Sequence, residues 1–153
     1  MQKITTNLWF AGNAKEAVDF YVSIFPSSKI LNTGYYPKTA EEGLAEFQLN
    51  LAGEILVIEF ELSGQKFTAI NADNTFKFTE AISLNISCKD QEEIDYYWSA
   101  LTKDDGKESV CGWLKDKYGL SWQVNPENMG ELMKKPGSFA KMMQMKKIIV
   151  ADF

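Results

Sequence analysis

The chain contains two similar stretches, Asn7-Leu-Trp-Phe-Ala-Gly-Asn-Ala-Lys-Glu-Ala-Val-Asp-Phe-Tyr-Val-Ser-Ile-Phe25 and Ser83-Leu-Asn-Ile-Ser-Cys-Lys-Asp-Gln-Glu-Glu-Ile-Asp-Tyr-Tyr-Trp-Ser-Ala-Leu101. They align without a gap, and the identical pairs are Leu8/Leu84, Glu16/Glu92, Asp19/Asp95, Tyr21/Tyr97 and Ser23/Ser99. Each stretch has the pattern of a short apolar strand, a polar turn and an amphipathic helix. The repeat predicts a fold of two similar modules, with a small ligand bound in a cleft.

The length of 153 residues fits a single domain made of two modules, at about 1–75 and 76–126, followed by a helical tail over 127–153. The net charge is −5, and the chain contains no run of basic residues. Because phosphate binding needs clustered Lys and Arg, we expect no nucleic-acid partner.

Membrane insertion and secretion are not expected either. No stretch approaches the roughly 20 apolar residues that span a bilayer, and the residues from Met1 to Asn7 lack a secretory hydrophobic region. Cys88 and Cys111 are too few for a disulfide framework and form no Cys-x-x-Cys motif. We expect two reduced structural thiols and a cytoplasmic location.

The first half of the chain predicts strands around one helix. Helical spacing from Ala14 ends at Pro26, while Ile55–Leu62 and Gln65–Asn71 flank Ser63-Gly64, a two-residue hairpin signal. This register pairs Leu62 with Gln65, Glu61 with Lys66, Phe60 with Phe67, Glu59 with Thr68 and Ile58 with Ala69. Leu44–Leu51 alternates well enough to predict one further strand.

Glu59 and Glu61 share one face of that hairpin. They could form a carboxylate pair for acid–base work or metal binding. The favoured interpretation is that Glu61 faces Lys66 across the ladder while Glu59 faces solvent, because two-residue alternation routinely produces such pairs.

The second half repeats the pattern. A strand over Ala81–Cys88 leads to a helix that Asp90 caps, with Glu93 completing a capping box. Val110–Lys115 and Leu120–Asn125 then predict a second hairpin, and helical segments follow Pro126. The fold class is therefore α+β, with a mostly antiparallel, curved sheet and a C-terminal helical tail.

The tail is rich in methionine, at Met142, Met143 and Met145. These side chains could form an adaptable binding surface. The favoured interpretation is a terminal helix packed on its own core or on a second subunit, because Met fills irregular apolar gaps.

Several motifs resemble the PhnB-like branch of the vicinal oxygen chelate superfamily, which includes glyoxalase I, bleomycin-resistance proteins and extradiol dioxygenases. They are Phe10-Ala-Gly-Asn-Ala-Lys-Glu-Ala17, Phe76-Lys-Phe-Thr-Glu-Ala-Ile-Ser83, Asp90-Gln-Glu-Glu-Ile-Asp-Tyr-Tyr-Trp98 and Cys111-Gly-Trp-Leu-Lys-Asp-Lys-Tyr-Gly-Leu-Ser-Trp-Gln-Val124. This branch is often labelled a 3-demethylubiquinone-9 3-methyltransferase-like domain. The resemblance implies paired βαβββ modules around a cupped sheet with helices outside, usually in a homodimer. Leu44–Gly53 looks longer than the family's usual link.

The resemblance also implies where a metal would bind in members that use one, with one ligand on each of four strands. These positions fall at Asn7, near Asn71, at Ser83 and at Gln123. They offer neutral oxygens only, whereas a transition metal favours imidazole, thiolate or carboxylate. The chain has no histidine, so we expect no bound metal.

Other catalytic machinery is sparse. Without histidine, a general base would have to be a buried carboxylate such as Glu80 or Glu46, and spacing gives neither of them a partner. Cys111 lacks a neighbour that would activate it as a nucleophile. No Gly-x-Gly motif is present to bind adenosylmethionine or a dinucleotide, so we expect no organic cofactor and treat the methyltransferase label as an inherited name.

A polar and aromatic cleft remains. Alternation puts Asn7 and Trp9 on one face of the first strand, with Leu8 and Phe10 on the other face, against the helix. The predicted cleft residues are Asn7, Trp9, Phe67, Asn71, Ser83, Asn85 and Gln123. They favour a small neutral or aromatic organic molecule, although the same side chains could simply fill the cup.

Three functions therefore stay open. The favoured one is a metal-free protein that binds or sequesters a small organic molecule, with homodimerisation expected. The second is a metal-dependent lyase, isomerase or dioxygenase, besides the methyltransferase activity that the family label implies. The third is a scaffold whose main role is dimerisation.

Overall fold

A computed structural model describes residues 1–153, which form two compact units, Met1–Lys77 and Phe78–Phe153. Each unit contains one sheet and a helix that covers one face of that sheet. The topology of the two sheets is the same, because the strand order β1-β4-β3-β2 in the first unit corresponds to β5-β8-β7-β6 in the second. The predicted α+β class with two βαβββ modules is confirmed.

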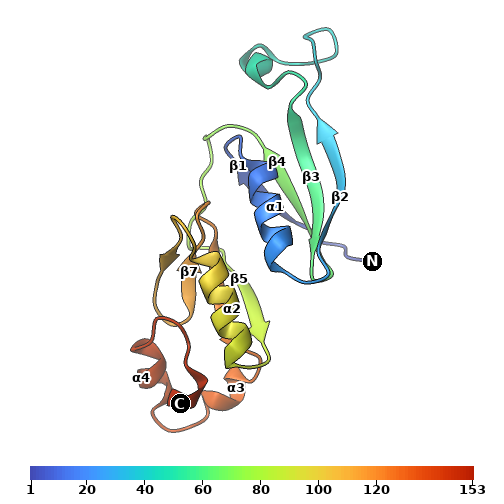
Figure 1. Cartoon of the computed structure of the whole chain (residues 1–153). Coiled ribbons are helices and arrows are strands. Elements are labelled where there is room, and N and C mark those ends of the chain that lie inside the picture. Colours follow the sequence, from blue (N-terminus) through green and yellow to red (C-terminus); the bar gives the residue numbers. More distant parts are fainter. The chain divides into compact units, whose positions relative to one another are not determined.

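The N-terminal unit is built from strands β1 to β4 and helix α1 (Figure 1). Its elements are β1 (Thr6–Phe10), α1 (Ala14–Ile24), β2 (Lys29–Tyr35), the 3-10 helix η1 (Glu46–Leu51), β3 (Ile55–Leu62) and β4 (Gln65–Asn71). β1 runs parallel to β4, and the other neighbours are antiparallel. The link between β2 and β3, which carries η1, extends beyond the ends of these two strands (Figure 1).

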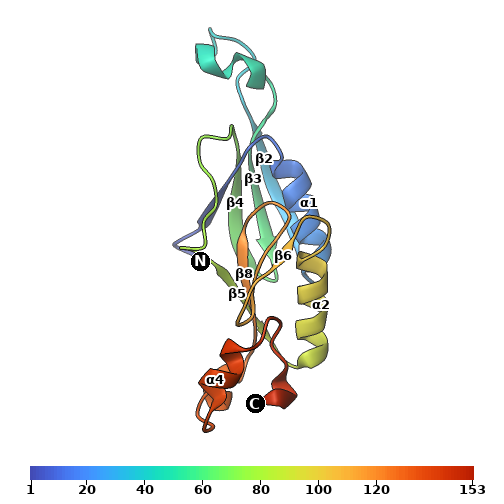
Figure 2. The same ribbon diagram turned by 90° about the vertical axis from the view of Figure 1, so that its left-hand side faces the viewer.

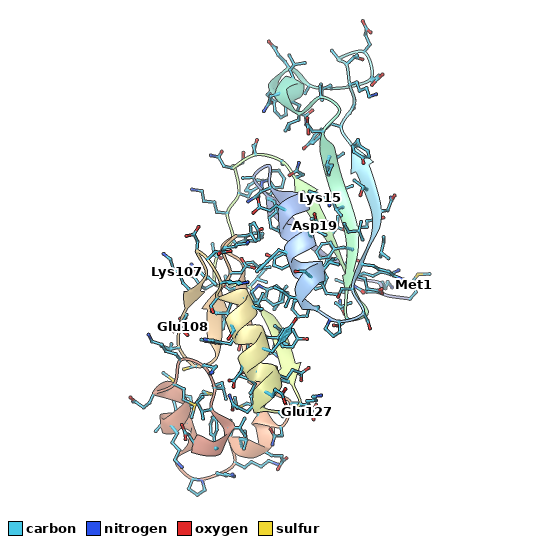
Figure 3. The ribbon with its side chains drawn as sticks, in the orientation of Figure 1. Met1, Lys15, Asp19, Lys107, Glu108 and Glu127 are labelled. Carbon is cyan, nitrogen blue, oxygen red and sulfur yellow. The ribbon has the colours of Figure 1, made fainter.

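Helix α1 covers one face of this sheet (Figure 2). Its inner side chains Ala17, Val18 and Tyr21 are fully buried, as their helical spacing predicts. On the outer side, Lys15 and Asp19 lie one turn apart and form an ion pair (Figure 3). The sheet therefore has a covered face toward α1 and an open face away from it.

The β3–β4 hairpin confirms the predicted register. Leu62 pairs with Gln65, Glu61 with Lys66 and Phe60 with Phe67. Ser63 adopts a left-handed backbone with φ of 46° and Gly64 one with φ of 86°, which is the turn geometry that matches strand twist. Glu59 is exposed and faces away from the buried Phe60 and Ile58, as expected for a solvated strand position.

The C-terminal unit repeats this plan with the strands β5 to β8 and helix α2 (Figure 2). Its elements are β5 (Leu84–Cys88), α2 (Gln91–Leu101), β6 (Lys107–Glu108), β7 (Trp113–Lys115), β8 (Ser121–Pro126), α3 (Met129–Leu132), α4 (Ser138–Met143) and the 3-10 helix η2 (Val150–Asp152). The Asp90 carboxylate accepts a hydrogen bond from the Glu93 backbone N–H at 2.9 Å, which confirms the predicted N-cap.

The tail after β8 packs on this second unit. Ile148 is fully buried, and the Gln91 side chain hydrogen-bonds both the Ile148 carbonyl, at 2.9 Å, and the Val150 N–H, at 2.8 Å. Lys147 and Asp95 form an ion pair at 2.7 Å. The tail is thus part of the core of the C-terminal unit.

Two local predictions need correction. Leu44–Leu51 does not form a strand, because η1 occupies Glu46–Leu51 and none of its residues is buried. The backbone N–H of Tyr36 donates to the Glu54 carbonyl at 2.8 Å, so the pairing of β2 with β3 closes just beyond the two strands and the link lies outside the sheet. The residue pattern of the second half located no strand at β6, which has only two residues, although the family resemblance implied a strand in this place. None of the helices has the length and apolar character needed to cross a membrane.

Candidate functional site

The open face of the N-terminal sheet carries Asn7 and Trp9, as strand alternation predicts. Leu8 and Phe10 are 5% and 2% exposed on the covered face, whereas Asn7 is exposed and Trp9 half-buried. The Asn7 amide donates to the Thr5 carbonyl at 3.0 Å. Trp9 is therefore the large side chain that β1 presents on this face.

Two contacts fix the Trp9 ring. Its Nε1–H donates to the Asp73 carbonyl at 2.8 Å. The Phe76 ring meets it edge to face, with ring centroids 4.9 Å apart and an interplanar angle of 79°. The segment after β4 thus holds the indole in place at the end of β1.

Phe67 and Asn71, which the sequence analysis grouped with Trp9, lie on the covered face instead. Phe67 is 7% exposed and stacks on Phe60, with centroids 5.5 Å apart. In β4, Phe67, Ala69 and Asn71 share one face, and Ala69 pairs with the buried Leu8. The side of β4 that faces the same way as Trp9 carries Ile70, its register partner.

Asn71 has a structural contact on each side of its amide. Its Oδ1 accepts from the Ala14 backbone N–H at 3.1 Å, and its Nδ2 donates to the Ile55 carbonyl at 2.9 Å. It is 8% exposed. The side chain therefore provides an acceptor for a backbone N–H in the first turn of α1, which has no partner within the helix. It also links α1 to β4 and β3.

In the C-terminal unit the structure brings Ser83, Asn85 and Gln123 together. Gln123 Nε2 donates to Ser83 Oγ at 2.9 Å. Asn125, which the sequence analysis did not single out, donates from Nδ2 to Asn85 Oδ1 at 2.7 Å. Its alternation with Gln123 along β8 is the signal that would have found it. The result is an amide and hydroxyl network across β5 and β8.

A pocket of about 490 Å³ opens in the N-terminal unit, beside the Trp9 ring. Its walls are mostly aromatic or aliphatic, and the lining residues are Trp9, Ala11, Gly12, Tyr36, Phe47, Gln48, Asn50, Leu51, Leu56, Ile70, Ala72 and Asp73. This volume lies within the usual range for small-molecule sites.

One wall of the pocket comes from η1. Phe47, Gln48, Asn50 and Leu51 all belong to this short helix. Gln48 Oε1 accepts from the Ala45 N–H at 3.1 Å and so fixes the first turn of η1. The sequence did not predict these residues as part of a site, because a strand there would have placed alternate side chains on opposite faces.

Tyr36 and Asp73 are the titratable groups that line the pocket. Burial, and then the Asp73 charge, raises the pKa of the Tyr36 phenol, which donates to the Asn71 carbonyl at 2.8 Å. Hydrogen bonds from Thr75, first from its side chain and then from its backbone, lower the pKa of Asp73. At neutral pH the phenol is neutral and the carboxylate is charged.

The donor set does not fit the metal that the fold family implies. The positions carried over for metal ligands are Asn7, Ser83 and Gln123, with Ile70 rather than Asn71 on the open face of β4. Amide, hydroxyl and aliphatic groups are poor ligands for a transition metal. In addition, no three His, Cys, Asp or Glu side chains converge anywhere in the structure.

The remaining reactive groups have structural surroundings. Burial, followed by the Glu93 and Asp90 charges, raises the pKa of the Cys88 thiol to about 12. Glu80 forms an ion pair with Lys115, whose hydrogen bond lowers the pKa of the carboxyl group. Cys111 Sγ lies 3.5 Å from Met143 Sδ. None of them is a base next to a nucleophile.

Comparison with known proteins gives one family match. Residues 2–125 match the family model described as 3-demethylubiquinone-9 3-methyltransferase. No curated protein matches the chain.

Solved structures share this fold. The PhnB protein from Bacillus cereus is 38% identical, with a TM-score of 0.66 over 80% of this chain and 98% of its own. A protein from Pseudomonas aeruginosa is 17% identical, with a TM-score of 0.62 over 83% and 98% of the two chains. The fosfomycin resistance protein FosX from Listeria monocytogenes is 14% identical, with a TM-score of 0.54 over 88% and 98%.

The family description does not extend to a cofactor site. A strand–turn–helix that holds adenosylmethionine needs close approach of the backbone, usually through a Gly-x-Gly turn. The turn between β1 and α1 is Ala11-Gly12-Asn13, with one glycine, and that between β5 and α2 is Lys89-Asp90, with none. The residues present therefore do not fit that cofactor.

Proposed function

For this chain, which belongs to the PhnB-like family of the glyoxalase and vicinal oxygen chelate superfamily, we propose the binding of a small organic molecule without a resident metal. The observation that carries the proposal is the pocket of about 490 Å³ beside Trp9. The cleft predicted from the sequence consisted of Asn7, Trp9, Phe67, Asn71, Ser83, Asn85 and Gln123. Of these residues, only Trp9 lines this pocket.

The chemistry of the walls supports an aromatic or apolar ligand. Trp9 and Phe47 supply ring surfaces, and Leu56 and Ile70 supply aliphatic ones. Phe47 is 79% exposed, so burying its ring against a ligand removes a large apolar surface from water. Asn50 and Gln48 add amides that orient polar substituents.

Calorimetric titration with naphthylmethanol, a neutral aromatic probe, tests the proposal. We expect a dissociation constant on the order of 1 mM or tighter, which is ordinary for so small a ligand. Phe47→Ala should weaken binding by about fivefold or more, since a ring contact is lost. Phe139→Ala is the matched control, because Phe139 is 64% exposed on α4 and lies outside the pocket.

Trp9→Ala should also abolish most of the binding, and circular dichroism checks that this variant still folds. Equal affinities in the wild type, Trp9→Ala and Phe47→Ala would contradict the proposal. So would the absence of any binding by naphthylmethanol together with a wider panel of aromatic probes.

Metal titration separates this proposal from a metal-dependent enzyme. With neutral donors at the family positions, we expect no stoichiometric binding of Mn, Ni or Zn in calorimetry. A sub-micromolar site, together with an activity lost to chelator and restored by metal, would overturn the metal-free proposal.

A further inference from the structure

A single charged residue lines the pocket of the N-terminal unit. Of its lining residues, Asp73 alone carries a formal charge at neutral pH, and no Lys or Arg is among them. An anionic ligand would meet a carboxylate without a compensating cation. A cationic ligand would find the opposite charge already in place.

The position of Asp73 relative to an aromatic ring is fixed. Its carbonyl accepts the Trp9 indole N–H at 2.8 Å, and its carboxylate Oδ1 accepts the Thr75 N–H at 2.9 Å. Asp73 is thus hydrogen-bonded through its backbone to the Trp9 indole and through its side chain to the turn that follows it. Indole is the aromatic group that attracts cations most strongly.

At neutral pH, Asp73 is negatively charged and the other titratable group of the pocket, Tyr36, is neutral. Hydrogen bonds from Thr75 hold the pKa of Asp73 below its usual range, so the carboxylate stays charged. The Tyr36 phenol, whose pKa is raised, stays neutral. The overall charge of −5 adds a weak attraction for cations.

We propose that the pocket selects a compact aromatic molecule with a positively charged amine, its ring between Trp9 and Phe47 and its ammonium group beside Asp73. This inference rests on the proposed function, since it names the class of ligand for the same pocket. The rings and aliphatic walls provide affinity, and Asp73 with the indole provides the preference for a cation.

Calorimetry on the full chain with three probes of equal ring size tests the selection. The probes are naphthylmethylamine, naphthylmethanol and naphthoate. We expect the amine to bind about threefold to fivefold more tightly than the alcohol, because the charge pair is exposed to solvent. Naphthoate should bind more weakly than both. Added salt should reduce the difference in affinity between the amine and the alcohol, because salt screens exposed charges.

Asp73→Asn removes the charge and keeps an oxygen that can accept the Thr75 N–H. In this variant we expect the amine to lose its advantage over the alcohol, so that the two probes bind equally. Asp105→Asn is the matched control, because Asp105 is exposed in the C-terminal unit and outside the pocket. This control should keep the preference of the wild type.

The outcomes separate the two proposals. If the alcohol binds through Trp9 and Phe47 but the amine gains nothing, or keeps its advantage in Asp73→Asn, the inference is overturned and the proposed function stands. If neither these three probes nor the wider panel of aromatic probes binds, the proposed function itself is overturned.

Discussion

Asn71 shows how one residue can look like a ligand in the sequence and act as a structural link in the molecule. It ends β4, where the family places a metal ligand, yet its amide connects α1 to β3. The hairpin register contained the information needed to find this, because Phe67 pairs with Phe60 and therefore puts Phe67, Ala69 and Asn71 on the covered face.

Asn71→Ala is expected to destabilise the fold by about 1–3 kcal/mol, since the Ala14 N–H and the Ile55 carbonyl would lose their partner in a buried place. Urea denaturation followed by circular dichroism measures this. Asn74→Ala, at an exposed position in the following loop, should change stability little. Equal stability of the two variants would show that Asn71 is not a structural link.

The raised pKa of the buried Cys88 thiol makes the stability of the fold depend on pH in the alkaline range. The pKa of this thiol is about 12 in the folded chain, against an ordinary value of 9.0. Between pH 9 and 12 the unfolded chain loses a proton that the folded chain retains. Stability from this group is therefore complete below pH 9 and declines as the pH rises through that window.

Cys88→Ala should flatten the alkaline decline by up to about 1.4 kcal/mol per pH unit. The free energy of unfolding in urea, measured at several pH values, gives both slopes. Parallel declines in the wild type and in Cys88→Ala would contradict the assignment. The comparison of slopes is informative even if the smaller side chain lowers stability at every pH.

At the level of elements, the sequence predicted the helices whose apolar residues recur with helical spacing and the hairpin whose turn has two residues. α1, α2 and the β3–β4 hairpin follow from helical spacing, the Asp90 cap and the two-residue turn at Ser63-Gly64. These signals are local, and the structure keeps them because the same residues also bury the core.

The elements that the sequence did not predict depend on partners far away in the chain. Leu44–Leu51 alternates, but it pairs with no strand of the sheet, and η1 occupies Glu46–Leu51 instead. The pocket beside Trp9 could not be found from the sequence for the same reason: η1, the end of β1 and the segment after β4 meet only in the fold.

The C-terminal tail is an element outside the family match, which ends at residue 125. Its Ile148 is fully buried, and the Lys147–Asp95 pair and the Gln91 amide hold the chain around it. The tail should therefore contribute to the stability of the C-terminal unit.

Ile148→Ala is expected to lower the free energy of unfolding by about 2–5 kcal/mol, the usual range for a buried aliphatic side chain. Thermal and urea denaturation provide the measurement. The control is Ile4→Ala, since Ile4 is 84% exposed. A change in Ile148→Ala no larger than in the control would mean that the tail only rests on the surface.

At the scale of the whole molecule, large apolar side chains remain uncovered. Ile82 is 70% exposed and Phe76 62% exposed. Such side chains are common at interfaces between subunits. We propose a homodimer in solution, and the exposed side chains of Ile82 and Phe76 are available to such an interface.

Light scattering on the eluting protein tests the dimer directly. We expect a molar mass of twice the 17.3 kDa of one chain, held over a wide range of concentration. A mass of 17.3 kDa at every concentration would show that the chain is a monomer.

The measurement that tests the central claim most directly is a nuclear magnetic resonance titration of the ¹⁵N-labelled chain with naphthylmethylamine. Binding in the pocket predicts shifts of the Trp9 indole N–H and of backbone amides in η1 and around Asp73. Resonances of β5 and β8 should stay in place. Shifts confined to the C-terminal unit, or no shifts at saturating probe, would contradict the account.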